Sequence, residues 1–66
     1  MDKEEIKELR NILGLSQQEF ANKIGVGIAT ITRWEIGKCK PSRMANRKLI
    51  AIKHRTKKLI INNGGI

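Results

Sequence analysis

A chain of 66 residues has the size of a single domain. Its one cysteine cannot form an internal disulfide, and one cysteine and one histidine alone cannot make a zinc site. No apolar run approaches the roughly 20 residues of a membrane span, and the charged N-terminus lacks the apolar core of a signal peptide, so a reducing, cytoplasmic location is expected. The net charge of +8 is concentrated in residues 38–66, where nine basic and no acidic side chains indicate either a polyanionic partner or a solubilising surface.

The first helix is predicted from about Lys3 to Leu13, with Ile6, Leu9 and Leu13 on one apolar stripe. Acidic residues at its start suit the helix dipole, and Gly14 is expected to end it. No segment sustains the alternation typical of a strand, so the chain is expected to be all-α.

A second helix is predicted to begin at Ser16, which forms a capping box with Glu19 three residues later. Gly25 is expected to end this helix because the following turn needs a positive φ angle. The inward-facing residues are expected to be Phe20, Ala21 and Ile24.

The third helix is predicted over roughly Ile28 to Ile36, closed by Gly37 and prevented from continuing by Pro41. Ile31 and Trp34 have helical spacing and are expected in the core, which makes a role for Trp34 in stacking on single-stranded nucleic acid less favoured. The turn and its two helices, about residues 16–36, have the pattern of a helix-turn-helix.

Ser42 is expected to cap a fourth helix, with Met44, Ala45, Leu49 and Ile52 on one side. The helical pattern continues from Lys53 without a glycine or proline, so this stretch is predicted as one long helix or two. Regular structure is expected to end over residues 62–65.

The outward side of the third helix has the residue types of a major-groove reader. Arg33 is its one long donor, and its fork matches the two acceptors of guanine. Ile28 and Ala29 suit thymine methyl groups, and Gly27 permits close approach of the backbone. The predicted base-reading residues are Gly27, Ile28, Ala29, Thr30, Thr32 and Arg33.

Phosphate contacts are predicted at the start of the second helix and after the third, because a helix N-terminus and flanking cations both attract phosphate oxygens. The residues predicted to contact phosphate are Ser16, Gln17, Gln18, Lys38, Lys40 and Arg43. Cys39 is expected to be an incidental loop residue and His54 a surface residue. The sequence contains no recognisable nucleophile–base pair, metal set or cofactor motif, so an enzyme is not expected.

The segments LGLSQQEFANKIGV and TITRWEIGK, followed by Pro-Ser, resemble the helix-turn-helix family of Cro and the lambdoid phage repressors, the XRE family. The resemblance covers about residues 6–52 and implies a four- to five-helix lambda-repressor-like DNA-binding domain. It also implies that Gln17 contacts a phosphate and braces the recognition helix, and that Arg10 and Glu35 form a partly buried ion pair.

Two departures from that family have consequences. Phage repressors often have glutamines where this chain has Ile28 and Ala29, so their operator sequences do not transfer. The stretch LIAIKHRTKKLI lacks the glycine turn of those repressors and is more similar to the DNA-binding half of MqsA-type antitoxins. Since no trace of their zinc-binding half is present, the chain is expected to be either a fragment or a free-standing regulator.

The leading functional prediction is a sequence-specific double-stranded DNA-binding transcriptional regulator, with repression favoured. The alternative is an antitoxin that binds a toxin and regulates its own promoter. A weak homodimer on a palindromic operator is expected, because one helix reads only a few base pairs. Its contact is predicted near Leu59, Ile60, Ile61 and Ile66, although Leu59 and Ile60 also suit the base of the core.

Overall fold

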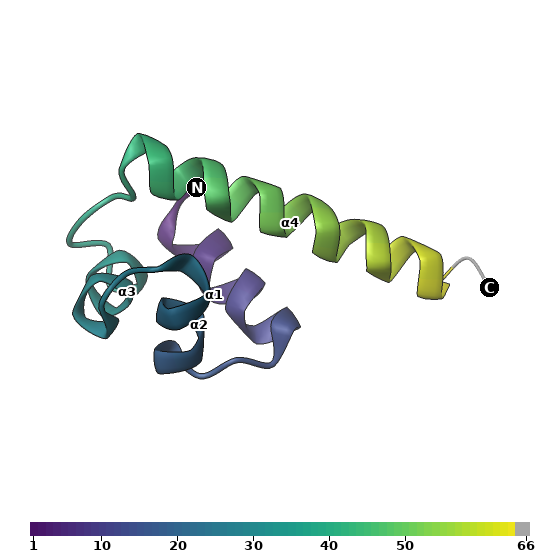
Figure 1. Cartoon of the computed structure of the whole chain (residues 1–66), viewed down its shortest axis with the longest axis horizontal. Coiled ribbons are helices and arrows are strands. Elements are labelled where there is room, and N and C mark those ends of the chain that lie inside the picture. The colour runs from purple at the N-terminus through teal and green to yellow at the C-terminus, as the bar shows by residue number, and fades with distance from the viewer. Residues whose placement is uncertain (65–66) are drawn as a thin grey trace.

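The computed structural model describes the backbone of residues 1–64 and the side chains of residues 1–56. Four α-helices follow one another along this part of the chain, and none of its residues is in a strand (Figure 1). The helices are α1 (Lys3–Leu13), α2 (Gln17–Ile24), α3 (Ile28–Glu35) and α4 (Arg43–Gly64). The prediction of an all-α domain with a helix-turn-helix is therefore confirmed.

The helix ends follow local sequence signals. Ser16 and Glu19 form the predicted capping box of α2, and Asp2 and Glu5 form a second one at the start of α1. The sequence had indicated only a favourable helix dipole for the acidic residues at the start of α1. The first three helices are each followed by a glycine at positive φ, at Gly14 (69°), Gly25 (89°) and Gly37 (79°). The turns after α1 and α2 are short, so α1, α2 and α3 are held close together.

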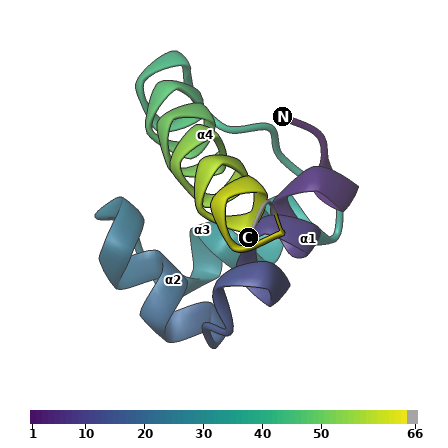
Figure 2. The same ribbon diagram turned by 90° about the vertical axis from the view of Figure 1, so that its right-hand side faces the viewer.

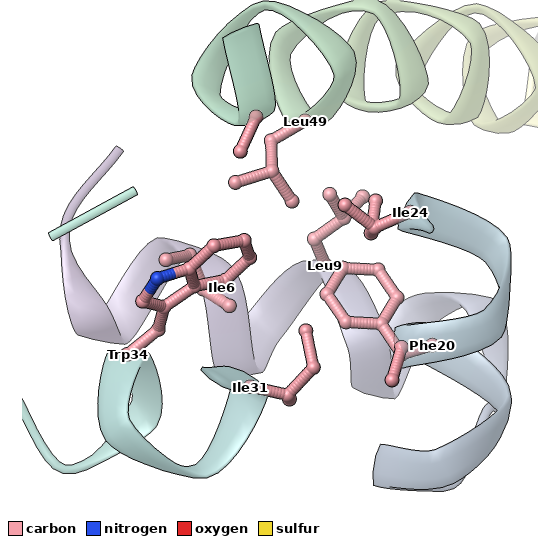
Figure 3. Packing of buried hydrophobic residues seen from close by; sticks show 9 residues of the cluster. Ile6, Leu9, Phe20, Ile24, Ile31, Trp34 and Leu49 are labelled. Atoms are coloured by element: carbon pink, nitrogen blue, oxygen red, sulfur yellow. The ribbon is translucent and has the colours of Figure 1, made fainter. Parts of the chain in front are cut away.

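All four helices contribute to one hydrophobic core (Figure 3). Its buried members are Ile6, Leu9, Phe20, Ala21, Ile24, Ile31, Trp34, Ala45 and Leu49. Trp34 is only 4% exposed, so its predicted place in the core is confirmed. Figure 3 shows Ile31 and Trp34 pointing from α3 towards the centre, which turns the opposite face of α3 to solvent.

The predicted apolar side of α4 was wrong at Met44, whose side chain is 74% exposed. Successive residues of a helix are rotated by about 100°. Ala45, Leu49, Ile52 and Thr56 follow one another at spacings of four, three and four residues and form the stripe that faces the core. Met44 is rotated about 100° away from Ala45 around the helix axis, so its side chain points away from the core.

The stretch after Lys53 continues α4 without a break, which is the first of the two predicted alternatives. The helix ends at Gly64, within the predicted range of residues 62–65. Figures 1 and 2 show α4 lying across α1 and α2. Lys48 Nζ donates to the backbone oxygen of Ile24 over 3.2 Å, and Lys53 pairs with Glu5 over 2.8 Å. The predicted dimer contacts Leu59, Ile60, Ile61 and Ile66 lie outside the described side chains.

Candidate nucleic-acid interface

The outward face of α3 is open to solvent. Because Ile31 and Trp34 anchor the helix in the core, the side chains on the opposite side of the helix point away from the core. Ile28 is 42% exposed, and the neighbouring Ala29, Thr32 and Arg33 are also exposed. Thr30 is half-buried, so it is the one predicted base reader that does not lie fully on this face.

The structure adds Ile36 to this face, and Ile36 is not among the predicted base-reading residues. Ile36 is 62% exposed and follows Thr32 by one helical turn, a spacing that the sequence already contained. We use the term α3 surface for Gly27, Ile28, Ala29, Thr32, Arg33 and Ile36.

Hydrogen bonding within the α3 surface leaves it with few free donors. The Thr32 hydroxyl donates to the backbone oxygen of Ile28 over 3.1 Å, which leaves only its acceptor capacity for a partner. The Arg33 guanidinium makes no hydrogen bond or ion pair with the described side chains and backbone. Gly27 precedes the helix without a side-chain cap, so the first backbone N–H groups of α3 remain available for an anion.

A buried carboxylate fixes the orientation of α3 from its inner side. Glu35 is 4% exposed and accepts from Arg10 through both oxygens, with Nε–Oε2 at 2.7 Å and Nη2–Oε1 at 3.0 Å. Gln17 at the start of α2 also donates to Oε1, over 3.2 Å, and Arg10 Nη1 donates to the backbone oxygen of Leu15 over 3.1 Å. One cluster therefore joins α1, both helices of the helix-turn-helix and the turn before them.

The protonation of this cluster follows from its contacts. Burial by itself raises the pKa of Glu35, but the hydrogen bonds from Arg10 and Gln17, together with the Arg10 charge, outweigh burial and leave that pKa lowered. The hydrogen bond to Glu35 raises the pKa of Arg10. Both groups are therefore charged at neutral pH, as an ion pair of this geometry requires.

The polar residues at the start of α2 already use part of their hydrogen-bonding capacity within the protein. Ser16 Oγ accepts the Glu19 backbone N–H over 3.1 Å, and Gln18 Nε2 donates to Asn22 over 3.1 Å. Gln17 uses one amide N–H on Glu35, which leaves a second N–H and its oxygen. A phosphate at this helix start would therefore meet backbone N–H groups and the remaining side-chain donors.

The loop that joins α3 to α4 is fastened to the end of α3. Lys38 N–H donates to the Arg33 oxygen over 2.9 Å and Gly37 N–H to the Trp34 oxygen over 3.1 Å, which is the Schellman pattern. Lys38, Lys40 and Arg43 are exposed, and none of them forms an ion pair with a described carboxylate. Lys38 and Lys40 lie in this loop, and Arg43 is the first residue of α4. Figure 1 shows the loop rising from the end of α3 to the start of α4.

No group of histidine, cysteine and carboxylate residues in the described part of the chain could hold a metal ion. Cys39 and His54 are exposed and lie in separate elements. Within the described part of the chain, no helix has both the length and the apolar character needed to cross a membrane.

Comparison with known proteins gives one match. A family model described as helix-turn-helix matches residues 6–44, which is more than half of the chain. The matched segment contains the Arg10–Glu35 pair and the whole α3 surface. No curated protein and no solved structure matched the chain.

Proposed function

The chain belongs to this helix-turn-helix family, of the XRE type, and we propose that it is a sequence-specific reader of double-stranded DNA. Proteins of this family are DNA-binding transcription regulators. The proposal rests on the α3 surface, which is exposed and has no acidic side chains. The buried bidentate ion pair between Arg10 and Glu35 fixes the orientation of α3 from its inner side.

The dimensions of α3 fit the major groove. An α-helix with its side chains is about 10–12 Å across, and the major groove of B-DNA is about 12 Å wide, so α3 can lie in it. In the proposed complex, base edges face the α3 surface, with Thr30 at its border. Phosphates on the two sides contact the start of α2, at Ser16, Gln17 and Gln18, and the cations Lys38, Lys40 and Arg43.

We further propose that the protein is a repressor that acts in the cytoplasm by occupying a promoter. Binding as a homodimer on a palindrome supports this role physically, because two half-sites about 34–36 Å apart supply the sequence information that one helix lacks. The described residues offer no catalytic constellation that would suggest an enzyme instead.

The direct test is duplex binding measured at several salt concentrations, on random-sequence DNA and on a duplex selected from it. We expect log K to fall with log salt by about 0.9 for each phosphate neutralised. Replacing Lys38 and Lys40 by glutamine should reduce the slope by about 2 in total. Lys23→Gln, at the far end of α2, is the matched control and should leave the slope unchanged. A salt-independent or unmeasurable affinity would refute DNA binding.

One observation favours the alternative function, an antitoxin that binds a toxin. Ile50 on α4 is 40% exposed and borders a pocket of about 370 Å³ that is also lined by Met1, Glu5, Lys53 and His54. Ile50 belongs to neither the α3 surface nor the predicted phosphate contacts, so the reading of DNA does not account for it. Loss of the gene separates the two functions: an antitoxin's loss stops growth, whereas a repressor's loss raises transcription from its promoter. An Ile50→Glu variant that still protects the cell would count against a toxin contact there.

A further inference from the structure

The α3 surface is unusual in being almost entirely apolar. Ile28 and Ile36 are 42% and 62% exposed, and Ala29 is exposed on the same face. The Thr32 hydroxyl proton is used within the helix, so Arg33 is the only side chain of this face that still offers donors. A merely solvated helix face would be expected to carry several charged or amide groups.

The groups that bases present in the major groove decide what such a face can read. Adenine is ordinarily recognised by the side-chain amide of asparagine or glutamine, and the α3 surface has neither. Guanine offers two acceptors that suit Arg33. The one apolar group on any base edge is the methyl group at C5 of thymine, and this is the only group on which Ile28 and Ala29 can gain by excluding water.

We infer that the α3 surface recognises C5-methylated pyrimidines close to a guanine, so that 5-methylcytosine is accepted wherever thymine is. Ala29 precedes Arg33 by one turn, about 6 Å along the helix axis, which corresponds to roughly two base-pair steps of 3.4 Å. The preferred steps therefore have a methylated pyrimidine within about two base pairs of the guanine. This inference rests on the proposed reading of double-stranded DNA.

Cytosine methylation is then a signal that this protein reads. A cytosine carries no apolar group in the groove until its C5 position is methylated, and the methyl group then occupies the place that it has in thymine. Methylation of a cytosine near the guanine should raise affinity by the same factor that separates thymine from uracil. For one buried methyl group that factor is about fourfold.

The experiment uses random-sequence duplexes prepared in three chemistries. The first contains thymine and cytosine, the second uracil and cytosine, and the third uracil and 5-methylcytosine. The protein selects bound sequences from each pool, and affinities are then measured for the enriched duplexes. We expect thymines near a guanine in the first pool, 5-methylcytosines at the corresponding places in the third, and affinities at least fourfold weaker in the second.

The Ile28→Ala variant identifies the side chain responsible. It should weaken binding to the thymine-containing duplexes and so lower the thymine-to-uracil affinity ratio towards one. Ile12→Ala is the matched control, because Ile12 is 48% exposed on α1 and lies outside the α3 surface. Circular dichroism melting should show that both variants fold.

Two results overturn the inference in different ways. Equal enrichment and affinity in all three pools would refute methyl recognition while the salt dependence still supports DNA binding. The absence of salt-dependent binding in any pool would refute the proposed function itself, and the inference with it.

Discussion

The ion pair behind α3 gives the sharpest prediction for the stability of this fold. Replacing Arg10 by methionine removes the guanidinium and leaves Glu35 as a carboxylate that is 4% exposed. Breaking a buried pair by removing one partner costs about 3–5 kcal/mol. The Arg10 side chain is 20% exposed and Gln17 still donates to Glu35, so we expect the lower end, about 3 kcal/mol.

This loss is large for a chain of this size. At 0.05–0.15 kcal/mol per residue, the free energy of unfolding of the whole domain is about 3–10 kcal/mol. A loss of about 3 kcal/mol corresponds to a fall in Tm of about 12–24 °C, which thermal unfolding followed by circular dichroism measures directly.

The pH dependence provides a second readout that a general packing defect would not share. In the folded wild type the pKa of Glu35 is lowered from its ordinary 4.5, so its contribution to stability is present above about pH 4.5 and is lost as the pH falls through the folded pKa. In Arg10→Met the burial of Glu35 remains but the arginine is gone, so the pKa of Glu35 should be higher than in the wild type. The stability difference between the two proteins should therefore be largest at neutral pH and shrink in acid.

Two further variants separate the pair from other effects. Lys53→Met breaks the exposed ion pair with Glu5, whose side chains are 48% and 41% exposed, and it should change stability little. Adding Glu35→Leu to Arg10→Met removes the stranded carboxylate and should restore most of the lost stability. A loss in Arg10→Met below about 1 kcal/mol, or one that is the same at neutral and acidic pH, would refute the reasoning.

Four other substitutions test the helix ends and the α3 surface. Arg33→Ala should leave Tm nearly unchanged but cost about 1–3 kcal/mol of discrimination between base pairs, measured by competition between duplexes; a large fall in Tm would mean that this side chain supports the fold. Gly25→Ala should destabilise the domain in thermal melts, because φ is 89° at Gly25. At Gly27 φ is −76° and the space around an added Cβ is open, so Gly27→Ala should preserve stability and weaken only DNA binding. Ser16→Ala should cost about 1 kcal/mol in denaturant unfolding, and no change would show that the capping box contributes nothing.

Local signals in the sequence were sufficient for the helix ends and for most of the core. The capping box at Ser16 and the glycine turns at Gly14 and Gly25 depend on neighbouring residues only, so they could be predicted without knowing the fold. The spacing of Ile31 and Trp34 likewise predicted which side of α3 is buried, and hence which side is open to solvent.

Features that depend on contacts between residues far apart in the sequence could be seen only in the tertiary structure. Met44 and Ala45 are adjacent apolar residues, and the way α4 lies on α1 and α2 decides that Ala45 is buried and Met44 exposed. The stretch from Lys53 to Ile61 contains no glycine or proline that would break a helix. The sequence therefore could not decide between one long helix and two shorter ones.

The sequence by itself determined the all-α class, the helix-turn-helix and the concentration of basic charge after residue 37, because composition and short-range spacing encode all three. Only the tertiary structure showed that Gln17 shares the Glu35 carboxylate with Arg10, that the Thr32 hydroxyl is used within its helix, and that Ile36 extends the exposed face of α3. Such facts depend on where side-chain atoms meet in space. No periodicity contains that information, because the partners come from different helices or depend on one rotamer among several.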